Sequence, residues 1–198
     1  MLNIKLTHSE LSPHLSWQVN WSVQPGLANW LQGANGVGKT SLFEEIKIQW
    51  HRPSLQLGFV DQEPLVPFQD LTVAQVFDLL WDIGANRRVT AQWQQLKYWD
   101  EESRSLWPRK VALLSGGENQ WIKVLMMLSL KSDIWLLDEP FQSLDQRRRE
   151  TLLRLLASWL EEGKYLILSH HGSELSLPAK TWHLEHQPTG TYVREGGQ

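Results

Sequence analysis

The sequence contains no cysteine, and this absence excludes two classes of structure. Disulfide bridges cannot cross-link the fold, and thiolate ligands cannot hold a metal ion. The chain also lacks a long hydrophobic run, since its longest apolar stretch, near residues 124–130, is far shorter than the ~20 residues that a membrane-spanning helix needs. We therefore expect a soluble chain, whose role at a membrane, if it has one, depends on a partner protein.

An excess of either charge is missing as well. Nineteen basic and 22 acidic side chains leave a formal net charge of −3 and a pI near 6.2. Without a basic field, we expect no nucleic-acid partner. The first residues alternate like a strand and lack the apolar core of a signal peptide. A length of 198 residues, 41% of them hydrophobic, predicts one domain over residues 1–198.

Tryptophan, in contrast, is abundant, with 12 residues in the chain. These residues are scattered from Trp17 to Trp182, so they do not form one local cluster in the sequence. Tryptophan is highly buried on average. We interpret the tryptophans as core and interface residues rather than as one aromatic platform for a ligand.

A glycine-rich loop between an apolar run and a helix-like segment is the first sign of a ligand. Residues 33–40 fit the pattern G-x-x-x-x-G-K-[ST], in which backbone N–H groups surround a triphosphate. Lys39 is predicted to bind the β- and γ-phosphates, and the Thr40 hydroxyl to coordinate Mg²⁺. A turn that binds nothing is the weaker alternative because strand, loop and helix follow in the required order. The predicted ATP contacts here are Gly33, Ala34, Asn35, Gly36, Val37, Gly38, Lys39, Thr40 and Ser41.

Two adjacent carboxylates follow a second apolar run. Asp138 and Glu139 come after residues 134–137, at the carboxyl end of a predicted buried parallel strand, where open α/β sheets bind ligands. Adjacent side chains on an extended segment face opposite ways, which allows separate roles. Asp138 is predicted to hold Mg²⁺, and Glu139 to activate the attacking water as general base. A solvated strand end is the alternative, which the phosphate loop makes less attractive.

With these motifs the chain resembles the ATP-binding subunit of ABC transporters over nearly all of its length. Residues 114–118, Leu-Ser-Gly-Gly-Glu, are similar to the family's signature loop. The resemblance implies that Ser115, Gly116 and Gly117 bind the γ-phosphate of ATP held by a second subunit. A hydroxyl and N–H groups at a helix start suit an anion. Residues 143–145, Ser-Leu-Asp, are similar to the D-loop at the dimer seam.

Two further positions take their roles from this resemblance. Gln62 matches the Q-loop glutamine that senses the γ-phosphate and Mg²⁺. His170 follows the apolar run 165–169 and matches the switch histidine, and we prefer it to its neighbour His171. The predicted metal-site residues are Thr40, Gln62 and Asp138, and the predicted catalytic residues are Lys39, Glu139 and His170.

The expected fold class is α/β, a P-loop NTPase core of ABC type with an antiparallel β-subdomain and a helical subdomain. Residues 2–33 have the alternating pattern of strands. Helical patches at residues 73–81 and 91–99 place the helical subdomain at approximately residues 63–130.

The first part of the chain departs from the family in two places. Only 23 residues separate Lys39 from Gln62 (62 − 39), so the β-hairpin of many family members is expected to be shortened or missing. Glu10 stands where the family usually has an aromatic residue that stacks on adenine. His8 and His14 are nearby candidates for that role.

A third departure follows the signature loop. Trp121 and residues 125–127, Leu-Met-Met, replace the usual arginine and the Ala-Arg-Ala run. Farther along, we interpret the three arginines at 147–149 as the solvated face of a helix.

The sequence therefore predicts an ATP-hydrolysing subunit of an ABC transporter with ATP and Mg²⁺ as cofactors. We expect a homodimer or heterodimer that sandwiches ATP and powers a membrane-embedded partner subunit from the cytoplasmic face of the membrane. Two alternatives remain: a soluble ABC ATPase that acts on ribosomes or DNA, and an ATP-binding regulator without turnover. The first usually carries a second cassette or a coiled-coil insertion, and the second would not need Glu139 and His170.

Overall fold

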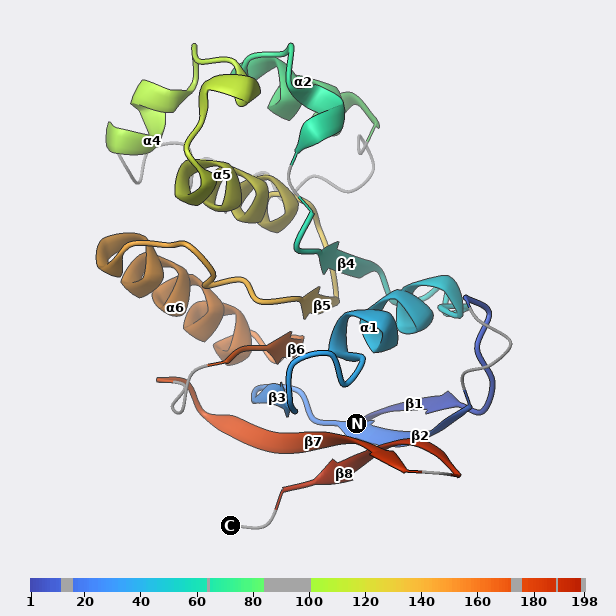
Figure 1. Cartoon of the computed structure of the whole chain (residues 1–198). Coiled ribbons are helices and arrows are strands. Elements are labelled where there is room, and N and C mark those ends of the chain that lie inside the picture. Colours follow the sequence, from blue (N-terminus) through green and yellow to red (C-terminus); the bar gives the residue numbers. More distant parts are fainter. Residues whose placement is uncertain (12–15, 64, 84–100, 172–175, 188, 197–198) are drawn as a thin grey trace.

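Among the described residues, eight strands form one sheet in the order β1-β2-β8-β7-β3-β6-β5-β4. The computed structural model, drawn in Figure 1, describes residues 1–11, 16–63, 65–83, 101–171, 176–187 and 189–196. The strands are β1 (Leu2–Leu6), β2 (Trp17–Val23), β3 (Ala28–Gln32), β4 (Leu57–Val60), β5 (Ile134–Leu137), β6 (Tyr165–Ser169), β7 (Ala179–Gln187) and β8 (Gly190–Glu195). The helices are α1 (Lys39–Ile48), α2 (Val73–Ile83), α4 (Glu101–Leu106), α5 (Gly116–Leu128) and α6 (Gln146–Glu161), with 3-10 turns η1 (Val66–Phe68) and η3 (Val111–Leu113).

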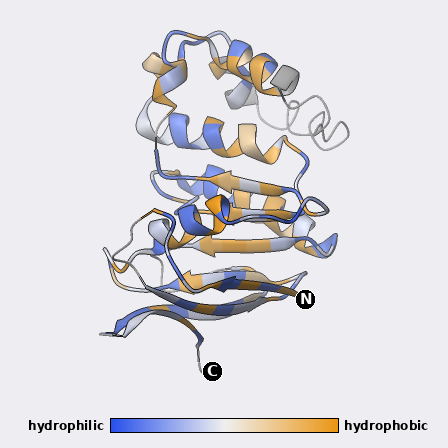
Figure 2. Cartoon of the chain, turned by 90° about the vertical axis from the view of Figure 1, so that its right-hand side faces the viewer, coloured by the Kyte–Doolittle hydropathy of each residue, from blue (hydrophilic) through white to orange (hydrophobic). Residues whose placement is uncertain are grey.

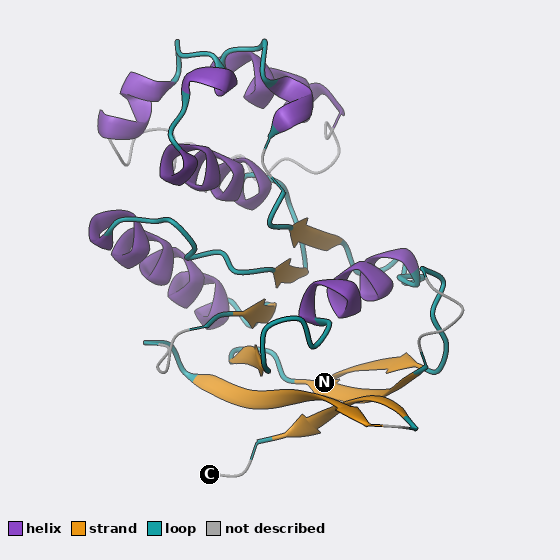
Figure 3. Ribbon diagram, in the orientation of Figure 1, coloured by secondary structure: helices purple, strands orange, loops and turns teal. Residues whose placement is uncertain are grey.

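One half of the sheet (Figure 3) is parallel, and the other half is antiparallel except where β2 pairs in parallel with β8. Strands β3, β6, β5 and β4 pair in parallel, and β7 also runs parallel to β3. Antiparallel pairing joins β1 to β2 and β7 to β8. Parallel neighbours need long crossover connections, and here α1, the α2–α5 segment and α6 supply them. The predicted α/β class with an antiparallel β-subdomain is confirmed.

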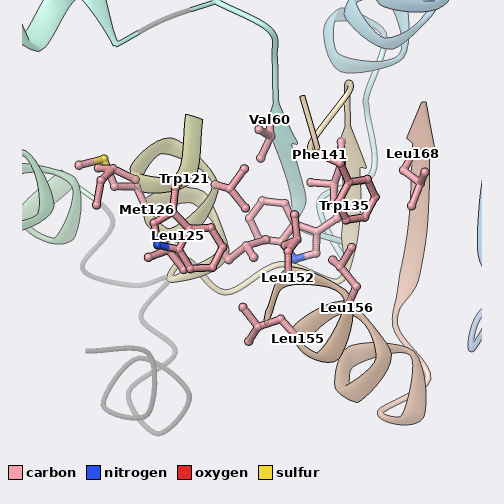
Figure 4. Close-up of a cluster of buried hydrophobic side chains, with 14 of the residues drawn as sticks. Val60, Trp121, Leu125, Met126, Trp135, Phe141, Leu152, Leu155, Leu156 and Leu168 are labelled. Atoms are coloured by element: carbon pink, nitrogen blue, oxygen red, sulfur yellow. The ribbon is translucent and has the colours of Figure 1, made fainter. Parts of the chain in front are cut away.

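Two hydrophobic cores lie on opposite faces of the parallel strands. In β5, Ile134 and Leu136 belong to one core, and Trp135 and Leu137 to the other, as the period of two along a strand requires. All four β5 residues are buried because helices cover both faces. Figure 2 accordingly shows these strands as largely hydrophobic. One core joins α1 to β1 and β2, and the other joins α5 and α6 to the parallel strands (Figure 4).

Seven of the tryptophans that the structure describes lie in these two cores, in agreement with the prediction of core positions. Trp17, Trp21, Trp121 and Trp135 are each at most 1% exposed. Trp135 stacks on Trp159 of α6 with ring centroids 5.4 Å apart. The Trp121 Nε1 group donates to Ser103 Oγ at 2.9 Å. Trp121, which replaces the family's arginine, therefore packs α5 against α4 instead of presenting a charge.

The predicted helical subdomain contains α2, α4 and α5, which lie together above the parallel strands in Figure 1. The predicted helix at residues 91–99 lies outside the described residues. Residues 49–56, all described, connect α1 to β4 without a strand, so the expected loss of a β-hairpin is confirmed. No helix in the described part of the chain combines the length and the apolar character needed to cross a bilayer.

Candidate functional site

The glycine-rich loop connects the carboxyl end of β3 to the first turn of α1. Gly36 and Gly38 have φ angles of 76° and 103°, which side-chain-bearing residues rarely adopt. Gly38 caps α1, so the loop leads directly into the free N–H groups and the positive dipole end of that helix. This is the geometry that favours binding of a phosphate.

Lys39 lies across this loop and is 8% exposed. Its ammonium donates to the carbonyl oxygens of Gly33 at 2.8 Å and Ala34 at 3.1 Å. The charge is therefore held within the loop by neutral acceptors. An anion bound at the loop would be a stronger partner for this charge than either carbonyl.

The three predicted metal-site residues converge beside Lys39, although they are far apart in the sequence. The Thr40 hydroxyl donates to Asp138 Oδ2 at 2.6 Å, and Gln62 Nε2 lies 3.4 Å from Thr40 Oγ1. Asp138 is fully buried, and its other oxygen accepts from Ser169 Oγ at 2.5 Å. Hydroxyl, amide and carboxylate oxygens are suitable ligands for Mg²⁺.

A protein-only metal cage is missing from the described residues, since no group of three or more His, Asp or Glu side chains could hold an ion. Mg²⁺ commonly binds to one or two protein oxygens and takes further ligands from substrate phosphates and water. Thr40, Gln62 and Asp138 therefore fit an ion that arrives with a nucleotide better than a resident one.

Glu139 lies next to this cluster but points in another direction. Its side chain contacts the two histidines that follow β6: Oε1 lies 3.1 Å from His171 Nε2, and Oε2 lies 3.8 Å from His170 Nδ1. The His171 N–H also donates to Oε2 at 3.3 Å. The φ angle of Glu139 is 48°, a strained value for a residue other than glycine. Such strain is common at functional sites.

The two histidines differ in their surroundings. The His170 side chain is 9% exposed, packs edge-on against Phe141 and has its Nε2 atom 2.9 Å from Arg149 Nη2. Because a guanidinium can only donate, this nitrogen is the acceptor of the ring. The His171 side chain is 52% exposed. The sequence analysis preferred His170 as the switch histidine. In the structure, His171 is the histidine that lines the pocket in front of the glycine-rich loop.

That pocket has a volume of about 350 Å³ and lies in front of the glycine-rich loop. It unites residues from the loop, from α1, from the end of β4 and from the end of β6. Its lining residues are Asn35, Gly36, Gly38, Lys39, Thr40, Ser41, Gln62 and His171.

The predicted signature loop does not line this pocket. Ser115 caps α5 in a capping box: its Oγ accepts from the Glu118 N–H at 3.3 Å, and Glu118 Oε2 accepts from the Ser115 N–H at 2.7 Å. This second hydrogen bond is the main reason that the pKa of Glu118 is lowered, with Arg109 adding to the effect. Ser115 and Gly116 are exposed at the start of α5, and a Cβ on Gly117 would collide with the Ser143 carbonyl. The loop is therefore preformed and packed on the predicted D-loop.

The segment around Glu10, where the family usually has the residue that stacks on adenine, is held by a buried carboxylate. Glu45 of α1 accepts hydrogen bonds from Ser9 Oγ and from the N–H groups of Glu10 and Leu11, the latter two at 3.0 Å. The Glu10 side chain instead pairs with His8 at 3.0 Å on the surface. His14 lies outside the described residues. Residues 8–11 contain no Phe, Tyr or Trp, so His8 is the remaining candidate in this range.

The interpretation of residues 147–149 as a solvated face is wrong for two of the three arginines. Arg148 is 7% exposed and pairs with Asp145 at 3.2 Å. Arg149 contacts His170 and lies over the Phe141 ring at 5.3 Å. The reason is that the turn from β5 folds back over the start of α6, which the periodicity of α6 alone does not reveal.

Sequence reasoning also missed Lys123 and Glu45. Lys123 is a lysine within an otherwise apolar run of α5, and this pattern was a usable signal. Its ammonium contacts Asp61 and Glu63 on either side of Gln62. Glu45 carries no such signal because acidic residues are ordinary on a helix.

Residues 17–142 match the ABC transporter family. The chain belongs to this family. A taurine import ATP-binding protein from Shigella dysenteriae is 30% identical over 176 residues, which are 79% of this chain and 67% of that protein. An ABC transporter ATP-binding protein from Bacillus cereus is 24% identical over 88% of this chain. The chain spans only 35% of that relative's length.

Solved structures share the ABC ATPase fold. A dimeric ATP-binding cassette in a post-hydrolysis state, bound to ADP and Pi, has a TM-score of 0.73, with 99% of this chain and 98% of that chain covered at 19% identity. An RNase-L inhibitor has a TM-score of 0.77 at 20% identity, with 100% of this chain and 40% of that chain covered. At these identities the likeness establishes the fold alone.

In this member of the ABC family, substitution of Glu45 tests whether its hydrogen bonds hold the segment before β2. Burial alone would raise the pKa of this carboxyl, but hydrogen bonds from Ser9, Leu11, Glu10 and Gln49 outweigh it and lower the pKa to about 2. A lowered pKa adds stability that is fully present above the unfolded value of 4.5 and is lost as the pH falls toward 2. We expect Glu45→Gln to reduce the free energy of unfolding at pH 7 by about 2 kcal/mol, since a charged acceptor is replaced.

Urea unfolding of both proteins at pH 7, 6, 5 and 3.5 measures this difference. The gap between them should be constant from pH 7 to 6 and narrow toward pH 3.5. A gap that stays constant down to pH 3.5 would show that Glu45 is not the titrating group.

The histidines provide a second test. His170 and His171 both contact Glu139, but of the two only His171 lines the pocket. We expect either alanine variant to lower ATP turnover about tenfold or more, because each removes a contact with Glu139, the predicted general base. His171→Ala should also weaken ATP binding several-fold, while His170→Ala should leave it unchanged. Steady-state kinetics measures the change in turnover, and equilibrium titration measures the change in ATP binding. Full activity in His171→Ala would contradict a role of His171 in this site.

Proposed function

We propose that this chain is the ATP-hydrolysing subunit of a transporter, and that two such subunits sandwich ATP and Mg²⁺ between them. The observation that carries the proposal is that Lys39, Thr40 and Gln62 line one pocket, while the signature loop lies exposed elsewhere. The buried Asp138 joins this cluster through its hydrogen bond with Thr40. One subunit thus provides two incomplete halves of a nucleotide site. A second copy, or a related subunit, completes both.

The residues in and beside the pocket then have defined tasks. Gly33–Ser41 bind the phosphates through backbone N–H groups, and Lys39 compensates the charge of the β- and γ-phosphates. Thr40, Gln62 and Asp138 would hold Mg²⁺, which would supply Lewis-acid stabilisation of the phosphate oxygens. Glu139 accepts the proton of the attacking water as general base. His170 and His171 hold the Glu139 carboxylate.

The signature loop acts on the nucleotide of the other subunit. Its Ser115 hydroxyl and the N–H groups of Gly116 and Gly117 are a ready anion site at the start of α5. Closure on ATP brings this site to the γ-phosphate. ATP binds the closed pair better than the open one, and this difference in affinity drives the conformational change.

We further propose that this change is transmitted to a membrane-embedded partner and that the chain is peripheral on the cytoplasmic face of the membrane. The taurine import protein among its relatives supports the transport reading. The alternative is a role without a membrane partner, since the fold is shared with an RNase-L inhibitor.

Cell fractionation distinguishes these roles. We expect the tagged chain to sediment with membranes in a lysate at high salt, and to leave them when its membrane subunit is deleted. Sedimentation with ribosomes that is sensitive to ribosomal dissociation would instead favour the soluble alternative. As a control, Lys39→Ala should distribute as the wild type does, because partner binding does not require hydrolysis.

The sandwich is tested by blocking hydrolysis. Glu139→Gln keeps the shape of the side chain but removes the base, so turnover should fall about 10²-fold or more while ATP binding persists. The unhydrolysed nucleotide should then hold a dimer that size-exclusion chromatography detects with Mg-ATP and not without it.

Adding Ser115→Arg should return this protein to a monomer, since the arginine blocks the anion site on α5. Lys39→Ala should abolish both turnover and nucleotide-dependent dimers. A Glu139→Gln protein that binds ATP and stays monomeric would refute a homodimeric sandwich and direct attention to a heterodimer or a regulator.

A further inference from the structure

Lys123 is a buried cation on the helix that begins with the signature loop. It is 3% exposed, and lysine is almost never fully buried unless it is paired. It is also the one basic residue in α5 (Gly116–Leu128). Burying this charge needs a specific set of partners.

Those partners all belong to residues 61–63, which we call the Q-loop segment. The Lys123 ammonium donates to the carbonyl of Glu63 at 2.7 Å and to the carbonyl of Asp61, and it lies 3.4 Å from Asp61 Oδ1. An ammonium has three protons. All three are matched by acceptors within this segment.

Gln62 lies between the two residues whose carbonyls Lys123 binds. Its amide nitrogen is 3.4 Å from Thr40 Oγ1, and Gln62 lines the pocket in front of the glycine-rich loop. Gln62 is exposed, so burial does not fix its side chain. The backbone on either side of Gln62 therefore determines where the amide lies.

The electrostatic surroundings agree with this geometry. Burial lowers the pKa of the Lys123 ammonium, and the carboxylates of Asp61, Glu63 and Asp138 act against this effect. The nearby carboxylates thus offset part of the cost of burying the ammonium. A buried ammonium with fixed carbonyl partners is a more rigid link than a surface ion pair, because water does not compete for it.

We propose that Lys123 is a positioning residue that fixes Gln62 relative to the signature helix α5. Through it, a displacement of α5 is transmitted to the amide beside Thr40. This inference rests on the proposed ATPase function and adds to it a link between the signature helix of a subunit and that subunit's own metal site.

The decisive variant is Lys123→Met, which keeps the length of the side chain and removes the three donors. We expect kcat to fall about tenfold or more, since Gln62 is no longer held. The Mg²⁺ concentration for half-maximal turnover should rise several-fold. Binding of ATP without Mg²⁺ should change less than about twofold, because the phosphate loop is untouched. A loss of packing alone would not produce this split.

Asp61→Asn is the matched control. It removes the charge of the partially exposed carboxylate but keeps the two carbonyl acceptors, so its kcat should remain within about twofold of the wild type. Lys123→Gln, which retains an N–H donor, should lie between the wild type and Lys123→Met and serves where the methionine variant does not fold.

A double-mutant cycle with Gln62→Ala tests the route. When Lys123 acts through Gln62, the effects on kcat are not additive, and Lys123→Met adds little in the Gln62→Ala background. Additive effects, or wild-type kinetics in both Lys123 variants, overturn the proposal. The proposed function fails separately, if the wild type shows no turnover above that of Lys39→Ala.

Discussion

The buried carboxylate of Asp138 is the interaction on which the site depends. An ionised carboxylate out of water is costly unless hydrogen bonds satisfy it. Asp138 receives one from Thr40 at the start of α1 and one from Ser169 at the end of β6. Ser169 Oγ in turn accepts from the N–H of Glu139 at 2.9 Å. This carboxylate thus fixes the start of α1, the backbone of Glu139 and the end of β6 relative to one another.

This arrangement follows from the strand order. The carboxyl ends of β3, β6, β5 and β4 are adjacent because the strands are parallel. Short polar segments that follow these strands therefore meet, although Gln62 and His171 are more than 100 residues apart in sequence (171 − 62). The hydrophobic cores on both faces of the sheet hold these strands in place, and with them the polar residues at the strand ends.

Much of this was predictable because each motif is local. The glycine spacing at residues 33–40 and the two carboxylates after an apolar run specify loop chemistry regardless of the remaining fold. The contacts that the sequence did not reveal are between segments. Arg149 reaches His170, Glu45 holds the segment before β2 and Lys123 binds the Q-loop segment. Periodicity reports which face of a helix is buried, but not which backbone carbonyl a buried charge will meet.

The side chains of Asp138 and Glu139 point in different directions, as expected, but the cause differs from the expected one. The sequence argument assigned their opposite directions to the alternation of an extended strand. Strand β5 in fact ends at Leu137, and Glu139 has a left-handed φ of 48°. The chain turns there, and Ser143, with φ of 61°, is the second such residue in the same turn.

This turn brings the Ser143 carbonyl against Gly117, where a larger residue would collide with it. The strain that aims Glu139 at its histidines therefore belongs to the same turn that supports the signature loop. The positions of Glu139 and of the signature loop therefore depend on one turn, residues 139–143, and the close approach of Ser143 requires glycine at position 117.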